Sequence, residues 1–351
     1  MSGATTQRAS ADVHHRVADH AATGSLRDLL EYHRLSYAPE PLSEGTIFGL
    51  SGALDLRLRI GEQPAAMLDL DGRATSLEID LCRHIGLRAE WCETDDYASG
   101  WEMLALELDA GRPTLLRADV GEIDYHAERR HDTRHAIVVT GYDSATGVAT
   151  VLDGRFPDQQ QCSLSSLAAA RASRGVPAPA RHGLLRLRPG DPLAAPRPAI
   201  RAAVARVVHN MRRARRMDQL EIRCGLDAID ALATAWPRLP ETAGPDLART
   251  LQKLCQRIRD GANGGTLYRS LQARFEHDAA ALLGSAQLGR TALVCDDLVD
   301  AWRTFAAAID DEDADRAHTV GRPWLDRVRS LEHRHVEGLQ VHLGTGGRAF
   351  A

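Results

Sequence analysis

The sequence lacks the features that mark membrane and secreted proteins. No stretch approaches the roughly 18 to 20 uninterrupted apolar residues that a membrane span needs. The polar start MSGATTQRASADVHHR has no apolar centre of the kind that a signal peptide requires. The six cysteines are scattered without any C-x-x-C pair, which argues against a zinc ribbon or a disulfide framework. We therefore expect a soluble, cytoplasmic protein whose thiols are reduced and mostly buried.

Lysine and positive net charge are also scarce. Of 43 basic residues only Lys253 is a lysine, and the chain is dense in Ala, Arg, Asp and Gly, a composition that suggests a GC-rich bacterial genome. The net charge of −5 argues against a nucleic-acid-binding protein, because such proteins normally carry a positive field that replaces counterions along the phosphates. With 351 residues and 44% hydrophobic content, the chain is long enough for two ordinary domains.

Local periodicity in the first half predicts helices followed by strands. Residues 1–18 are polar and weakly periodic, so we expect a loose N-terminal arm. A helix is expected to begin just after residue 21, with Thr23 or Ser25 as a capping residue. Further helices are expected over 74–85 and 101–110, and strands over 114–116, 136–140, 148–152 and 184–187. This order indicates an α+β fold.

A change of composition separates the two halves. Residues 176–198 are rich in Pro, Ala and Arg, as linkers are, and from residue 199 to about 309 nearly every stretch has a helical pattern. We therefore predict a flexible arm over 1–18, an α+β domain over 19–190 and a helical domain over 191–345.

The strongest local signal for chemistry is the pair His135 and Asp153. His135 opens an apolar strand, and Asp153 ends the next strand 18 positions later, so a hairpin can bring the imidazole and the carboxylate side by side. A carboxylate on one ring nitrogen fixes the tautomer and leaves the other nitrogen to take a proton from a nucleophile. The alternative is that His135 is simply a hydrogen-bonded residue at the start of a strand.

Several short blocks of the N-terminal half form a pattern, and they are residues 20–27, 42–44, 47–50, 134–136, 141–143 and 153–154. Together they resemble the butirosin biosynthesis protein H family, whose N-terminal domain is similar to a papain-type fold. Residues 261–269, the helix around Phe275 and residues 300–302 look like the helical C-terminal domain that accompanies it. Family members are similar to acyltransferases that move an aminoacyl group from a carrier-protein thioester to an amine of an aminoglycoside.

The resemblance implies a Cys-His-Asp triad in which residue 21 is the nucleophile position, with His135 and Asp153 as its partners. A cysteine at the start of the first long helix has its thiol pKa lowered by the helix dipole, beside backbone N–H groups that hold an oxyanion. Here that position is Ala21, and Ser51 replaces a glycine of the family pattern. Two explanations compete: an engineered inactive variant, which we favour because the histidine and aspartate are retained, or a natural relative without covalent catalysis.

The resemblance also implies a substrate pocket and a partner. We expect no tightly bound cofactor and an acyl group delivered on the phosphopantetheine arm of a carrier protein. For Glu44 the alternative to substrate binding is a capping acid or a buried structural acid. For Asp119, and for Tyr125 with its neighbour His126, the alternative is a purely structural role. The substrate-binding candidates are His20, Glu44, Asp119, Tyr125 and Tyr268.

An acidic carrier protein should dock on a basic patch. Arg212, Arg213 and Arg216 lie in the densest basic cluster, at helical spacing, and are our docking candidates; the alternative is a solvated helix surface. The turn 263–266 has backbone N–H groups ahead of a helix that can hold a phosphate, or it simply joins two helices.

Other functions remain open at this stage. The same site in a thioesterase, cyclase or peptidase differs only in whether water, an internal group or an external amine attacks the acyl-enzyme, and a non-catalytic binding protein would keep Ala21 in its gene. We expect no metal site, because the His131 and His135 spacing aligns ligands only on a helix. The sequence favours no particular oligomeric state.

Overall fold

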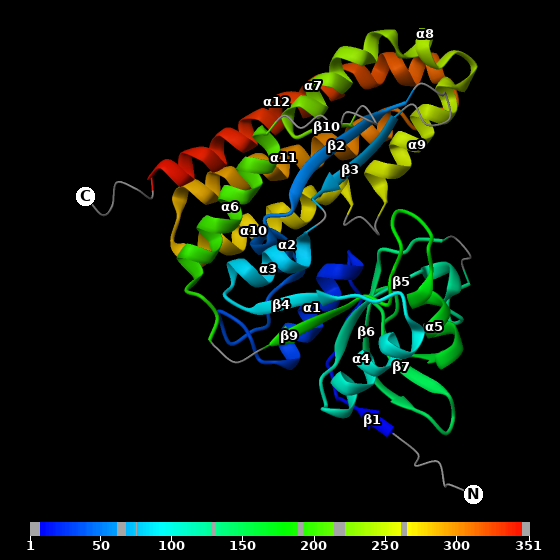
Figure 1. Cartoon of the computed structure of the whole chain (residues 1–351). Coiled ribbons are helices and arrows are strands. Elements are labelled where there is room, and N and C mark those ends of the chain that lie inside the picture. The colour runs from blue at the N-terminus through cyan, green and yellow to red at the C-terminus, as the bar shows by residue number, and fades with distance from the viewer. Residues whose placement is uncertain are drawn as a thin grey trace, which may run out of the picture. The chain divides into compact units, whose positions relative to one another are not determined.

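The computed structural model describes residues 8–61, 68–74, 76–127, 131–188, 192–213, 222–260 and 265–345. Its contacts form two compact units (Figure 1). Unit 1 consists of Met1–Glu44 and Gly86–Leu193, and unit 2 of Gly45–Ile85 and Ala194–Ala351. Unit 1 contains the larger sheet and unit 2 most of the helices, so the α+β class is confirmed.

Unit 1 is built on an antiparallel sheet with the order β4-β9-β5-β6-β7-β8, and β1 pairs with β6. β6 and β7 form the expected hairpin, in which Val138 lies opposite Leu152. Residues 135–142 of β6 are all buried, as in strands covered on both faces. The strands are β1 (Arg8–Ser10), β4 (Arg88–Cys92), β5 (Thr114–Ala118), β6 (His135–Asp143), β7 (Val148–Leu152), β8 (Gln160–Ser163) and β9 (Leu184–Arg188).

Three helices pack on this sheet: α1 (Ala21–Tyr32), α4 (Tyr97–Asp109) and α5 (Leu164–Ala172). Alternate residues of β6, including Ile137 and Val139, share a core cluster with α4 and α5. α1 contacts both β5 and β6, and its buried face includes Leu26, Leu29 and Leu30. The prediction of a helix start near residue 21 is confirmed.

Residues 8–18 differ from the loose arm that we expected over 1–18, whose first seven residues lie outside the described part of the chain. Ala9 and Ser10 of β1 pair with β6, and the amide of Ala18 donates to the carbonyl of Gly154 at 2.8 Å. A Cβ on Gly141 would lie 2.2 Å from the carbonyl oxygen of Ala9, so this close approach requires glycine there. β5 pairs with residues 135–139 of β6, so β1 pairs with the end of β6 that β5 does not reach.

Unit 2 contains a second antiparallel sheet with the order β10-β2-β3. β2 (Leu54–Ile60) and β3 (Leu68–Arg73) belong to sequence that we assigned to the first domain, together with α2 (Glu44–Ser51) and α3 (Leu77–His84). They group with the helical half because β10 (Ile222–Cys224) pairs with β2, so segments far apart in sequence lie side by side (Figure 1). Contacts with α6 (Pro196–Arg212), α7 (Leu226–Ala235) and α9 (Leu247–Arg259) complete this packing.

The long C-terminal helices confirm the predicted helical region and extend it. α10 (Arg269–Leu283) packs on α11 (Ala286–Ala308), and α11 packs on α12 (Ala314–Thr345). α12 lies within the helical domain that we predicted over 191–345, beyond the helical pattern that we described up to about residue 309. Among the described helices, none combines the length and the apolar character that crossing a bilayer demands. The remaining helical segments are α8 (Leu239–Ala243), η2 (Val120–Glu122), η3 (Trp236–Arg238), η4 (Gly244–Asp246) and η6 (Thr266–Tyr268).

Candidate active site

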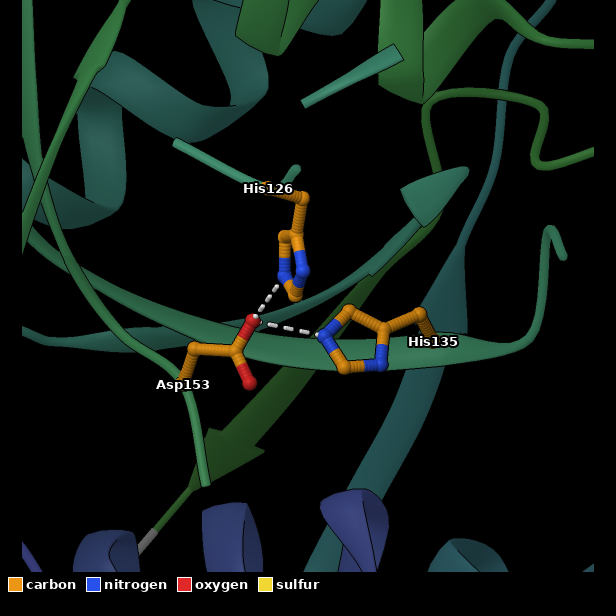
Figure 2. A group of neighbouring side chains, drawn as sticks. All are labelled: His126, His135 and Asp153. Atoms are coloured by element: carbon orange, nitrogen blue, oxygen red, sulfur yellow. Dashed lines mark hydrogen bonds and ion pairs between the residues drawn. The ribbon is translucent and has the colours of Figure 1, made fainter. Parts of the chain in front are cut away.

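A buried histidine and a buried carboxylate meet at one end of the β6–β7 hairpin. His135 is the first residue of β6, and Asp153 directly follows β7. His135 Nε2 lies 2.7 Å from Asp153 Oδ2. Because this bond uses Nε2, the Nδ1 atom of His135 remains on the other side of the ring (Figure 2). An imidazole held in this way can exchange a proton at Nδ1 while the carboxylate fixes its tautomer.

Asp153 also makes hydrogen bonds with a second histidine and with a tyrosine. His126 Nε2 lies 2.9 Å from the same Oδ2 atom, and Tyr125 donates its hydroxyl to it at 3.1 Å. Figure 2 shows both imidazoles directed at that one oxygen. The other carboxylate oxygen accepts the amide of Arg155 at 3.1 Å. Both oxygens of Asp153 are therefore occupied, and the carboxylate is fixed in one orientation.

The carboxylate is ionised in this setting. Burial alone would raise the pKa of Asp153, but the charge of His135 and the hydrogen bonds from His126 and His135 lower it well below its ordinary value. Burial, together with the nearby Asp153 charge, raises the pKa of the Tyr125 hydroxyl. Tyr125 is thus a fixed hydrogen-bond donor at neutral pH.

Residue 21 is the first residue of α1, where helix backbone N–H groups have no partner within the helix. Ser25, one turn later on the same face, donates to the carbonyl of Ala136 at 3.4 Å. That contact directs this face of α1 toward the His135 end of β6. Ala21 is partly exposed, whereas residues 22–30 are buried. The sequence therefore places a small, accessible side chain at a helix start beside the histidine strand.

His20 and Glu44 hold the backbone at this helix start. His20 is the N-cap residue, and its Nδ1 accepts the amide of Thr23 at 3.4 Å. Glu44 accepts the amides of Asp19 and His20 at 2.9 and 3.3 Å and the hydroxyl of Thr23 at 2.8 Å. The contacts described for Glu44 are thus those of a capping acid, the alternative that we gave for this substrate-binding candidate.

His15 is a residue that sequence reasoning missed. Its Nδ1 lies 2.5 Å from Asp28 Oδ2 of α1, and its Nε2 lies 3.2 and 3.0 Å from the carbonyl oxygens of Asp153 and Phe156. The N-terminal segment therefore ties α1 to the loop that contains Asp153. The sequence around His15 has no local pattern that predicts these contacts, because they join the N-terminal segment, α1 and the loop that contains Asp153.

All six cysteines lie in elements other than α1. Cys92 and Cys162 lie in strands β4 and β8 of unit 1, and the other four belong to unit 2. Burial raises the pKa of Cys162 to about 12, so this thiol is protonated at neutral pH.

Asp119 lies at the end of β5, and its contacts hold neighbouring loops. It accepts the amides of Gly121 and Asp132 at 3.1 and 3.0 Å and the hydroxyl of Ser173 at 2.6 Å. His131 Nδ1 lies 2.9 Å from Asp119 Oδ2. The Asp119 side chain is completely buried, so its described contacts are structural.

The remaining candidates lie in unit 2 or outside the described residues. Tyr268 stacks on Phe48 with ring centroids 5.2 Å apart and accepts a hydrogen bond from Arg73 Nε at 3.2 Å. Arg212 and Arg213 are exposed. α6 ends at Arg212, and Arg213 is its C-cap residue. Arg216 itself and residues 263 and 264 of the predicted phosphate turn lie outside the described residues.

Donor atoms of His126, His135 and Asp153 lie within 4.8 Å of one another. Both imidazoles already bond the single Oδ2 atom, so hydrogen bonding accounts for this arrangement without a metal ion.

Comparison with known families covers most of the chain. The family model described as butirosin biosynthesis protein H, N-terminal, matches residues 20–154, a span that contains Ala21, His126, His135 and Asp153. A second model, described as a domain of unknown function (DUF4872), matches residues 165–350. A search of curated proteins gave no match.

Proposed function

Because the chain belongs to the butirosin biosynthesis protein H family, we propose that its active form is a cysteine-dependent acyltransferase of natural-product biosynthesis. Family membership points to biosynthesis-related acyl transfer. The finer proposal is that unit 1 works as a papain-like enzyme with a Cys-His-Asp triad at residue 21, His135 and Asp153, and that the chain with Ala21 is inactive. The donor would be an acyl thioester on the phosphopantetheine arm of a carrier protein, and the acceptor an amine, as in aminoglycosides.

The observation that carries the proposal is the direction of the His135 ring. Its Nε2 bonds Asp153 at 2.7 Å, which leaves Nδ1 for a group at the start of α1. The face of α1 that includes residues 21 and 25 lies against this strand, through the bond from Ser25 to Ala136. A thiol at residue 21 would stand at a helix N-terminus beside an imidazole, two features that lower a thiol pKa.

With cysteine at residue 21, the chemistry has two halves. In the first, the thiolate attacks the thioester carbonyl, the backbone N–H of residue 21 stabilises the oxyanion, and His135 gives its proton to the departing carrier thiol. In the second, the acceptor amine attacks the acyl-enzyme, His135 takes the amine proton, and the residue-21 thiolate leaves. Asp153 stabilises the imidazolium in both halves.

For the carrier protein we propose docking at Arg212 and Arg213. Both guanidinium groups are exposed, and complementary charge accelerates and orients association with an acidic partner. The Ala21 chain suits the binding measurement, since it has no thiol at residue 21 to consume the donor. Reversing both charges to Glu should weaken carrier binding at low salt, whereas reversing the exposed Arg249 and Arg290 should not. Equal binding by the two double variants would remove this docking site.

A second candidate function is non-catalytic binding. An alanine at residue 21 that the gene itself encodes would favour this function. The buried network around Asp153 would then only preserve the fold of a binding pocket. Reading the codon for residue 21 in the source gene separates an engineered change from a natural one.

The test of the enzyme proposal uses the full chain carrying Ala21→Cys. An aminoacyl-carrier thioester and an aminoglycoside are added, and products are identified by mass spectrometry. An amide supports the proposal, whereas free acid alone indicates hydrolysis and cyclised product indicates ring closure. The Ala21 chain and the double variant Ala21→Cys with His135→Gln are the controls. A turnover rate for Ala21→Cys no higher than that of the Ala21 chain would overturn the assignment.

A further inference from the structure

The core of unit 2 contains a cluster of metal-binding residue types that the proposed reaction does not use. Glu276 of α10, Cys295 of α11 and His335 of α12 offer donor atoms that all lie within 4.8 Å of one another. All three side chains are completely buried. The cluster thus joins three packed helices (Figure 1), and sites in bundle cores are commonly built from facing helices in this way.

Hydrogen bonds within the cluster leave polar atoms unsatisfied. His335 Nε2 lies 2.6 Å from Glu276 Oε1, and Gln272 donates to that same oxygen at 2.7 Å. The second carboxylate oxygen of Glu276, the amide oxygen of Gln272 and His335 Nδ1 are buried and have no hydrogen-bond partner among the described residues. Buried polar atoms are normally paired, because leaving them unpaired costs their full desolvation free energy. These atoms therefore point to a ligand.

The neighbouring charges of Glu332 and Arg269 neutralise each other and do not involve the cluster. Glu332, one turn before His335 on α12, accepts hydrogen bonds from Arg269 Nε at 2.9 Å and from Trp302 Nε1 at 3.0 Å. Arg269 thus neutralises Glu332, and the charge of Glu276 is left to the cluster itself. A cation bound there would meet a carboxylate, a thiol and an imidazole.

We propose that Glu276, Cys295 and His335 bind one zinc ion in the core of unit 2. Thiolate, imidazole and carboxylate together are typical zinc ligands, whereas calcium and magnesium take oxygen ligands. On a tetrahedral zinc ion with bonds of about 2.0 to 2.3 Å, two ligand atoms lie roughly 3.3 to 3.8 Å apart. Binding would therefore widen the 2.6 Å contact between His335 Nε2 and Glu276 Oε1, within a cluster whose donor atoms all lie within 4.8 Å of one another.

The same three groups do not make a second nucleophilic site. No face of Cys295 reaches solvent, and fully buried structural thiols are inert. A structural ion that ties α10, α11 and α12 together is the role that complete burial allows. This role is independent of the proposed acyltransferase function.

The test is metal binding by the full-length Ala21 chain, with zinc content measured by elemental mass spectrometry after purification. Stripped protein is then titrated with Co²⁺, which gives a thiolate-to-cobalt charge-transfer band in the near ultraviolet when a cysteine binds it. We expect one equivalent of zinc and the cobalt band. Cys295→Ser should abolish the band and His335→Gln should weaken metal binding at least tenfold.

The matched control is Cys255→Ser, because Cys255 is also a buried thiol of unit 2 but lies outside the cluster. It should keep the zinc and the band. Far-ultraviolet circular dichroism checks that each variant is folded. Absence of both zinc and a cobalt band in the parent chain would overturn the proposal without any variant, and a band that survives Cys295→Ser would also overturn it.

Discussion

Replacing Asp153 by asparagine removes one charge from the buried network while keeping its shape. Asp153 Oδ2 accepts from Tyr125, His126 and His135, and Oδ1 accepts from the amide of Arg155. An asparagine amide keeps the backbone bond and at best two neutral bonds to the imidazoles. The variant loses one hydrogen bond to a charged group, and its two bonds to the imidazoles each become weaker by about 1 kcal/mol. We therefore expect its free energy of unfolding to fall by about 3 to 5 kcal/mol.

The effect should depend on pH in a defined direction. The folded state lowers the pKa of Asp153, so the stabilisation is fully present above the unfolded pKa of about 3.9 and is lost as pH falls below it. The stability difference between the parent chain and Asp153→Asn should therefore be constant from neutral pH to about pH 5 and shrink toward pH 3.

The assay is urea unfolding with hydrogen exchange of peptides from β6 and β7, which reports on unit 1 itself. Asp143→Asn is the matched control, since Asp143 accepts the amides of Ala145 and Thr146 in a turn and an asparagine oxygen can accept them too. That control should stay within about 0.5 kcal/mol of the parent. If Asp153→Asn is as stable as the control at pH 7, the network does not stabilise unit 1 and the reasoning is refuted.

Two further predictions concern unit 2. Trp302→Phe should cost about 1.5 to 3 kcal/mol in urea unfolding, because it removes the indole donor from the buried Glu332 carboxylate; an unchanged midpoint would contradict this. Gly49→Ala should cost about 1 to 3 kcal/mol in thermal unfolding, because the added Cβ would lie 1.8 Å from the Phe275 ring. Gly289→Ala, whose Cβ would meet nothing closer than 3.9 Å, should be neutral or stabilising by up to about 1 kcal/mol.

Local sequence patterns were enough to predict several strands of unit 1 and the meeting of His135 with Asp153. Alternating or continuous apolar runs predicted the strands at 136–140 and 148–152, which β6 and β7 contain. The same patterns suggested that His135 and Asp153 would meet, and their side chains lie 2.7 Å apart. Strand period and hairpin register are local properties, so a sequence can report them.

Long-range packing was not predictable in the same way. The pairing of β10 with β2 joins Ile222 to Arg59 across the linker, and no local pattern specifies which distant strand completes a sheet. His126 and His15 reach Asp153 through loops whose course depends on the assembled sheet. The sequence offered His126 only as the neighbour of the substrate-binding candidate Tyr125, because loop positions carry no periodic signal.

The central claim is that residue 21 stands where His135 and Asp153 activate a thiol. The most direct measurement is the rate at which iodoacetamide alkylates the Ala21→Cys protein at that residue, followed by peptide mass spectrometry across pH. The account predicts a thiol pKa well below the ordinary value of about 8.5, raised again in the double variant with His135→Gln. A residue-21 thiol that titrates near 8.5 with and without His135→Gln would contradict it.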